Sequence, residues 1–296
     1  MTGPARSNLA GGAWLLADMA LNIWALSIIK ALGLGYGPAQ LVFLRASVGV
    51  VVLSPWIWLG RRHFANLTNI PTHLARVAFS AIALSSSFYA ITRVPLAFFS
   101  AVGFTRPLVT MVLAALVLNE LIGPRRWLAA ALAMTGIAVA VNPREMVGGT
   151  GLIALLVMVL ASAGAVILTR RLRDAPKIVL MSFYAVGLTL LTAPIALTTW
   201  IPIAPAHMAP LLAVGLFASL AQLLYLRAHQ MGDAGFLSVL SYLSLIFSVS
   251  VGFLVFGETP DWSFFAGAAL VMTAALWVAI RERRAGRPAT SAGNRL

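Results

Sequence analysis

Long runs of apolar residues without a charged side chain recur along the whole chain. Residues 152–168 and 234–256 are apolar on every helical face, and residues 178–226 form an uncharged run long enough for two helices. A helix needs about 20 residues to cross a bilayer core of roughly 30 Å, and only helices or closed barrels satisfy their backbone polar groups there. Barrel strands would alternate apolar and polar residues, which these runs do not do. The sequence therefore predicts an all-α membrane protein with many spans.

Charges, prolines and glycines divide the chain into ten candidate spans. The Pro-rich stretch 201–205 breaks the longest uncharged run, because proline cannot continue a helical hydrogen-bond ladder. The predicted spans cover about residues 9–32, 38–60, 73–92, 95–119, 124–141, 150–169, 178–200, 207–227, 233–257 and 261–281. We expect a five-helix unit at 1–143, a second at 144–282, and a basic, disordered tail at 283–296.

Basic residues set the expected orientation. Of the 21 Lys and Arg residues, sixteen fall at the amino terminus, in alternate connections and in the tail, whereas only Lys30, Arg93 and Arg144 fall on the other side. The positive-inside rule then places both termini in the cytoplasm, and we expect a location in the bacterial inner membrane. Because the net charge of +13 belongs mainly to short loops between spans, nucleic acid is not expected as a partner. Five tryptophans near span ends are assigned to the membrane interface: Trp56, Trp58, Trp127, Trp200 and Trp262.

The two halves of the chain repeat each other at a shift of 138 residues. The shift superimposes Phe79–Thr135 on Phe217–Thr273 and matches Glu120 with Glu258. Because each unit has five spans, the second enters the membrane from the opposite side, which predicts two inverted repeats. A site between inverted repeats can open alternately to either side of the membrane, as a transporter requires. Small residues spaced four apart are expected to pack helices together: Ala131 and Thr135, with Ala269 and Thr273.

Short motifs lie in the second and fourth spans and at the ends of the fourth and ninth spans. They are Leu44-Arg45-Ala46, Arg106-Pro107, Asn119-Glu120-Leu121 and Gly257-Glu258-Thr259. On these motifs, and on the two five-span halves, the sequence resembles the EamA family of the drug/metabolite transporter superfamily over nearly its whole length. The run from Ser241-Tyr242 through Trp277 to Arg284 looks like bacterial aromatic amino-acid exporters of the YddG type. The resemblance implies an exporter of amino acids or other small metabolites.

Ionisable side chains inside a span are costly to insert and are candidates for function. Arg106 lies near the middle of its span, where its fixed fork of donors suits a substrate carboxylate; it could instead pair with Asp18 or cap carbonyls freed by Pro107. Asp18 lies on one helical face with Asn22 and could bind a substrate amino group or a proton, or pair with an arginine. Arg45 lies nearer a span end, and we expect a structural role in which its charge reaches the interface.

Aromatic and small polar residues complete the predicted binding site. Several of them are partners under the repeat, so they are expected to surround the axis between the halves on the first, third, fourth, sixth, eighth and ninth spans. An apolar pocket with a few polar groups suits a small amphiphilic ligand, although any one aromatic could simply pack or face lipid. The candidate substrate-binding residues, besides Arg106, Asp18 and Asn22, are Trp24, Phe79, Tyr89, Phe104, Ser162, Gln222, Tyr242 and Ser244.

Other chemistries find no support in the sequence. The chain has no cysteine, and no Walker A loop, HExxH motif or GxSxG elbow occurs. The four histidines, His63, His73, His207 and His229, lack metal-ligand spacing and are expected at solvated or interfacial positions. We therefore expect no cofactor, no metal and no enzymatic activity.

These observations predict an inner-membrane exporter of amino acids, including aromatic ones, that works by alternating access. Its partners would be the small-molecule substrate and the lipid bilayer, and a monomer is compatible with the two-repeat design. The alternatives are an exporter of another metabolite or drug-like compound, a passive pore and an integral-membrane enzyme acting on lipids.

Overall fold

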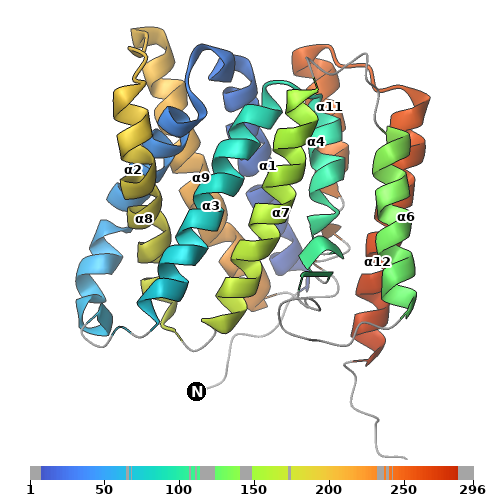
Figure 1. Ribbon diagram of the computed structural model, residues 1–296, viewed down its shortest axis with the longest axis horizontal. Coiled ribbons are helices and arrows are strands. Elements are labelled where there is room, and N and C mark those ends of the chain that lie inside the picture. Colours follow the sequence, from blue (N-terminus) through green and yellow to red (C-terminus); the bar gives the residue numbers. More distant parts are fainter. Residues whose placement is uncertain are drawn as a thin grey trace, which may run out of the picture.

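The protein is an all-helical bundle. The computed structural model describes residues 8–64, 67, 69–106, 108–110, 112–113, 124–140, 149–172, 175–231, 237, 240–241 and 243–285. Throughout these residues the regular elements are helices, most of which run roughly side by side from one face of the bundle to the other (Figure 1). We call the face from which α1 starts the N-terminal face and the other one the opposite face.

In the part of the chain that the structure describes, ten main helices form two sets of five. The first set is α1 (Asn8–Leu32), α2 (Pro38–Leu59), α3 (Ile70–Ile91), α4 (Leu96–Gly103) and α6 (Pro124–Ala140). The second set is α7 (Thr150–Arg171), α8 (Lys177–Thr198), α9 (Pro205–Met231), α11 (Leu243–Phe256) and α12 (Trp262–Ala285). Two short 3-10 helices, η1 (Gly33–Gly35) and η2 (Arg61–Phe64), follow α1 and α2.

The helices agree with the ten predicted spans. α1, α2, α3, α7, α8 and α9 are each long and apolar enough to cross a membrane, and shorter apolar helices cover Leu96–Thr110, Trp127–Ala140, Leu243–Phe256 and Trp262–Ala274. Parts of the predicted spans 95–119 and 233–257, and most of the predicted tail 283–296, lie outside the described residues. The all-α, ten-helix prediction is confirmed.

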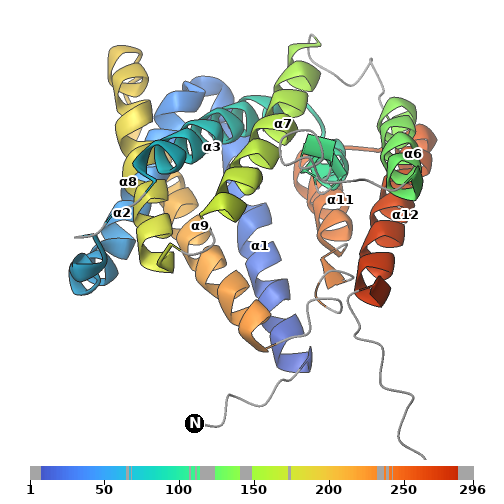
Figure 2. The ribbon, with the colours of Figure 1, turned by 60° about the horizontal axis from the view of Figure 1, so that its bottom comes forward.

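Helix packing shows the exchange symmetry of two repeats. α1 packs along α9, and α7 packs along α3, which is the same contact with the two halves exchanged (Figure 2). In the pairs α2–α8, α4–α11 and α6–α12, each helix packs on its counterpart in the other repeat. Exchanging the two repeats therefore leaves these three pairs unchanged. α1 starts at the N-terminal face and α7 starts at the opposite face, so the repeats are inverted (Figure 1).

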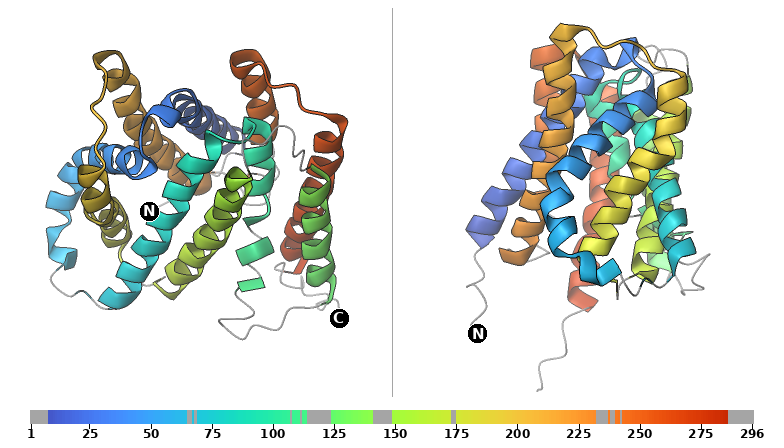
Figure 3. Two further views of the ribbon diagram at one scale, coloured as in Figure 1. Left: turned by 45° about the horizontal axis from the view of Figure 1, so that its top comes forward. Right: turned by 90° about the vertical axis from the view of Figure 1, so that its left-hand side faces the viewer.

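Two glycines let α6 and α12 cross closely at one edge of the bundle (Figure 3). A Cβ atom at Gly136 would lie 2.8 Å from the carbonyl oxygen of Gly267, and one at Gly267 would collide with the carbonyl oxygen of Gly136. The packing prediction for Ala131, Thr135, Ala269 and Thr273 is wrong. All four are exposed, and the two threonine hydroxyls donate to the carbonyls of Ala131 and Ala269 on their own helices.

One of the four histidines departs from its prediction. His73 is 1% exposed, and its ring stacks on Phe183 of α8 with 4.5 Å between ring centroids. The prediction of a solvated position is wrong because α3 begins at Ile70, three residues before His73, and already packs on α8 there. The five interfacial tryptophans are all exposed, as their assignment requires.

Candidate functional site

A central cavity of about 570 Å³ lies at mid-depth between the two repeats. Its lining comes from the middle of the long helices, including Asp18–Ile23 of α1, Ser80–Phe88 of α3 and Met158–Ala165 of α7. α4, α9 and α11 contribute as well, which are the remaining helices predicted to surround the axis. α2 and α8 add one residue each, Arg45 and Tyr184.

Arg106 reaches this cavity from the helical turn just beyond α4. Its side chain is exposed within the cavity, and no described residue forms a hydrogen bond or an ion pair with its guanidinium. In particular, no ion pair joins Arg106 to Asp18, although both are described and both line the cavity. The Tyr225 side chain on α9 interacts electrostatically with both of them. Of the alternatives left open by the sequence, the Asp18–Arg106 pair is thus not formed.

Asp18 and Asn22 form a polar pair on one face of α1. The Asn22 side-chain amide donates to the Asp18 carboxylate at 2.7 Å and to the Asp18 backbone carbonyl at 3.0 Å. Residues four apart on a helix lie on the same face, which explains the contact. Asp18 is only 8% exposed, so its carboxylate is fixed by this amide at the cavity wall.

The rest of the cavity wall is aromatic and hydroxylic. Phe88, Phe99 and Phe104 supply aromatic surface from α3, α4 and the turn after α4. The hydroxyls of Ser100 on α4 and Ser248 on α11 lie 2.6 Å apart and join the two repeats across the cavity. Among the described residues, the wall therefore combines one acid and two arginines that form no ion pair with apolar surface, as expected for an amphiphilic ligand.

Six of the eleven predicted site residues line the central cavity: Arg106, Asp18, Asn22, Phe104, Ser162 and Ser244. Gln222 lines a smaller chamber beside it.

The other four predicted residues lie elsewhere. Trp24 is 52% exposed on the outside of α1. Phe79 packs its ring against Gly164 of α7, where a Cβ atom would lie 3.0 Å away. Tyr89 donates to the Thr150 hydroxyl at 3.3 Å near the opposite face. Tyr242 lies outside the described residues.

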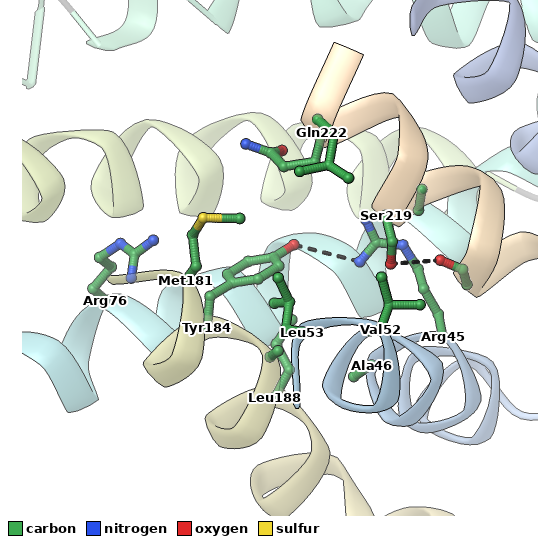
Figure 4. A pocket seen from close by; sticks show the side chains of 15 residues that line it. Arg45, Ala46, Val52, Leu53, Arg76, Met181, Tyr184, Leu188, Ser219 and Gln222 are labelled. Carbon is green, nitrogen blue, oxygen red and sulfur yellow. Dashed lines mark hydrogen bonds between the residues drawn. The ribbon is translucent and has the colours of Figure 1, made fainter. Parts of the chain in front are cut away.

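The chamber beside the central cavity has a volume of about 290 Å³ and lies between α2, α8 and α9 (Figure 4). Arg45, Tyr184 and Ala218 line both spaces, so the two are neighbours that share a wall. The prediction that Arg45 reaches the membrane interface is wrong, because its guanidinium points into the bundle and donates to the Tyr184 hydroxyl at 3.4 Å. The high cost of burying an arginine in a span was the sequence signal that could have identified it.

The opposite face is held together by one charge cluster. Glu258, between α11 and α12, places Oε1 2.8 Å from Lys30 Nζ at the end of α1. Glu258 Oε2 accepts a hydrogen bond from the backbone N–H of Leu96, the first residue of α4, at 2.8 Å. Lys30 also donates to the carbonyls of Val94 and Ile91, at 2.7 and 3.4 Å. The cluster ties together α1, the α3–α4 connection and the α11–α12 connection.

Backbone geometry places the Glu258 side chain. Gly257 has φ +65°, a left-handed conformation that suits glycine at a helix end. The N–H groups of Gly257 and Glu258 bond back to the carbonyls of Phe253 and Gly252, which ends α11 and turns the carboxylate toward α4. Apolar residues close to this face are fully buried, among them Ile29, Ile91, Val94, Leu96 and Leu155.

No group of three or more His, Asp or Glu residues that could hold a metal occurs in the described part of the chain.

Within the described residues, ten main helices in two inverted repeats, with a cavity of apolar and charged lining at mid-depth between them, define a multi-pass membrane transporter of the two-repeat class. The family model described as the EamA-like transporter family matches residues 12–142 and 149–280, so the chain belongs to this family. The narrower resemblance to aromatic amino-acid exporters is not confirmed by the relatives described next.

The chain is similar to several named bacterial transporters. An S-adenosylmethionine uptake transporter of Rickettsia felis is 24% identical over 286 residues, covering 96% of this chain and 97% of the relative. A riboflavin transporter of Rhizobium johnstonii is 30% identical over 222 residues, covering 73% of each chain. The pseudopaline exporter CntI of Pseudomonas aeruginosa is 27% identical over 257 residues, covering 84% of this chain and 89% of the relative.

A solved crystal structure supports the fold. It is 18% identical, covers 91% of this chain and 99% of its own, and superimposes with a TM-score of 0.59. The family and the named relatives are transporters of small molecules, and this chain is a multi-pass membrane protein of the same kind.

Proposed function

We propose that this protein exports amino acids, including aromatic ones, across the bacterial inner membrane by alternating access. The single observation that carries the proposal is the Arg106 guanidinium, which lies in the central cavity without a hydrogen bond or an ion pair to any described residue. An unpaired arginine at mid-depth is costly, and a substrate carboxylate would supply two charge-assisted hydrogen bonds. A bound carboxylate group thus explains the arginine better than packing does.

The cavity also offers a partner to the positively charged amino group of an amino-acid substrate. Asp18 is the one acidic residue among the described residues that line the cavity, and Asn22 holds its carboxylate in place. This carboxylate would accept hydrogen bonds from a substrate ammonium group. Phe99 and Phe104 offer aromatic surface to the substrate side chain. The site therefore separates a positive, a negative and an apolar region, which are the three parts of an apolar or aromatic amino acid.

The expected orientation of the chain indicates which side of the membrane the Lys30–Glu258 cluster closes. If the N-terminal face is cytoplasmic, as the distribution of Lys and Arg indicates, the Lys30–Glu258 cluster closes the periplasmic side. The structure would then represent a state that takes up its substrate from the cytoplasm. An exporter must pass through such a state, and it must break this cluster to release the substrate.

Counterflow in proteoliposomes with labelled amino acids tests the proposal. We expect saturable exchange of at least one aromatic amino acid. Arg106→Gln should weaken competition by carboxylate substrates by roughly 10- to 100-fold, as expected for lost charge-assisted hydrogen bonds, and should weaken the matching amides far less. Arg62→Gln, on the exposed 3-10 helix η2, is the matched control. Equal losses for acids and amides would show that Arg106 is structural.

Direction and substrate need separate measurements, because the relatives include both an uptake transporter and an exporter. Cells loaded with a labelled amino acid should lose it faster when they express this protein. Faster accumulation from the medium would instead make it an uptake system. Exchange of riboflavin or S-adenosylmethionine without exchange of any amino acid would favour transport of another metabolite.

A further inference from the structure

The side chamber between α2, α8 and α9 is not used by the proposed amino-acid site, yet it has its own set of charged residues. Its polar lining consists of Arg45, Arg76, Tyr184, Ser219 and Gln222, and no acidic residue is part of the described lining. The two guanidiniums lie on either side of the Tyr184 ring (Figure 4). The chamber is therefore positively charged, with apolar surface around the charges.

Arg45 has hydrogen-bonding capacity left for a ligand. Within the described residues its guanidinium makes one hydrogen bond, the 3.4 Å contact to the Tyr184 hydroxyl, and no described carboxylate lies within ion-pair distance. A guanidinium has five N–H donors, so most of them remain open. Since Arg45 also lines the central cavity, a ligand bound there can reach it without leaving the bundle.

Arg76 is a rigid second cation at the far side of the chamber. It donates through Nε to the Thr169 hydroxyl at 2.9 Å and through Nη1 to the Leu180 carbonyl at 3.1 Å, which fixes it between α7 and α8. Its guanidinium carbon lies 5.9 Å from the centroid of the Tyr184 ring. Held in this way, Arg76 adds positive charge to the chamber without having to move.

Gly49 keeps the chamber open on the α2 side. A Cβ atom there would meet only the Ser219 hydroxyl oxygen, at 3.7 Å, an ordinary contact distance. The space next to Gly49 is thus part of the chamber and is not needed for a close helix crossing. A Cβ atom is accepted at this position, and a larger side chain would extend from it into the chamber.

We infer that the side chamber is a second anion subsite, which receives the far end of an elongated substrate whose amino-acid end lies at Arg106 and Asp18. The inference rests on the proposed function and adds to its aromatic substrates a further class, amino-acid-like metabolites with a second anionic group. Such a substrate would extend from the central cavity past the shared wall of Arg45, Tyr184 and Ala218. Its body would lie against apolar surface in both spaces, and its second charge would lie between two arginines.

Matched pairs of competitors test the inference in counterflow assays. 2-Aminopimelate and 2-aminoheptanoate differ only in whether the far carbon is a carboxylate or a methyl group, and shorter and longer homologues cover the chain lengths. At the best length, the wild-type protein should prefer the acid by about tenfold or more, as one charge-assisted contact allows. The measured quantity is the ratio of the two competition constants, so a general loss of transport in a variant cancels.

Variants assign the preference to the chamber. Arg45→Gln and Gly49→Leu should bring the ratio to about one, whereas Arg76→Lys, which keeps the charge, should retain most of it, and Arg62→Gln should leave it unchanged. A wild-type ratio near one, with both compounds transported, overturns the inference and leaves the proposed function intact. Persistence of the full preference in Arg45→Gln and in Gly49→Leu overturns it as well.

The absence of any amino-acid transport would overturn the proposed function. A binding measurement keeps the inference about the side chamber testable in that case. Pimelate, a dicarboxylate without an amino group, should raise the thermal unfolding midpoint of the purified protein, and Arg45→Gln should abolish the shift. The absence of a shift in the wild type would overturn the subsite.

Repeating the measurement with anionic phosphatidylglycerol in place of zwitterionic phosphatidylcholine distinguishes a lipid headgroup as the occupant. If the anionic lipid alone gives the Arg45-dependent shift and blocks pimelate, the chamber is a lipid site and the inference fails.

Discussion

At the scale of single residues, the charged side chains inside the bundle gather at cavity walls. Arg106, Arg45 and Asp18 all lie within spans, and the structure places all three at cavity walls. Asn22 holds the Asp18 carboxylate at 2.7 Å, so the acid has a fixed direction even without a substrate. Burial of these groups is costly in a membrane, and a ligand of opposite charge offsets that cost.

Asp18→Asn tests the amino end of the site. The substitution keeps the shape of the side chain and removes its charge, so amino acids should compete about tenfold less well, whereas 2-oxo acids and other deaminated analogues should change little. Competition in the counterflow assay measures both classes in one preparation. If amino acids and deaminated analogues lose equally, Asp18 supports the helix bundle instead of binding the amino group.

The residue scale also shows where sequence reasoning stops. The cost of charge in a span predicted that Arg106 and Asp18 are candidate site residues, and both line the central cavity; helical spacing predicted Asn22 as the neighbour of Asp18. Tyr184 was missed because one tyrosine in an uncharged run carries no such signal. Trp24 and Phe79 satisfied the repeat, yet they lie at 52% and 41% exposure and line neither cavity described here. Which way an aromatic side chain points depends on the rotation of its helix, and that rotation is set by neighbours distant in sequence.

At the scale of helices, the Lys30–Glu258 cluster fixes the opposite face. Glu258→Gln should loosen it, because a neutral amide cannot pair with Lys30, although it can still accept from the Leu96 N–H. The chain has no cysteine, so Leu26→Cys introduces a single reporter at the central cavity. We expect its labelling by an impermeant maleimide in intact cells to be several-fold faster in the Glu258→Gln background.

The control for this experiment removes a neighbouring acid from the same connection. Asp261→Asn leaves the Lys30–Glu258 pair in place and should not change the labelling rate. Unchanged labelling in Glu258→Gln would mean that apolar packing, and not the charge cluster, closes this face.

The α6–α12 crossing gives a prediction about stability. Gly267→Ala places a methyl group against the Gly136 carbonyl and the Ala140 side chain, and we expect it to destabilise the protein by about 1–3 kcal/mol through overpacking. Gly49→Ala is the matched control, since the methyl group meets only the Ser219 hydroxyl oxygen at an ordinary contact distance and should stabilise its helix by roughly 0.5–1 kcal/mol. Thermal unfolding in detergent compares the two, and similar midpoints would show that α6 and α12 can separate without cost.

At the scale of the whole molecule, the inverted arrangement requires the two repeats to start on opposite sides of the membrane. A reporter tag placed after residue 290 should be found in the cytoplasm and one placed after residue 145 in the periplasm, as the asymmetry of Lys and Arg predicts. Fusions to a phosphatase and to a fluorescent protein measure the two locations. Tags found in the same compartment would contradict both the orientation and the inversion of the repeats.

The sequence alone determined the number of helices, their approximate bounds and the duplication. In lipid each helix must satisfy its own backbone hydrogen bonds, so a span is specified by its local composition and can be recognised without its neighbours. The tertiary structure decided which side chains meet. It separated Asp18 from Arg106, turned Arg45 inward, buried His73 and closed one face through Glu258, because these contacts depend on the tilt and rotation of helices that are far apart in the chain.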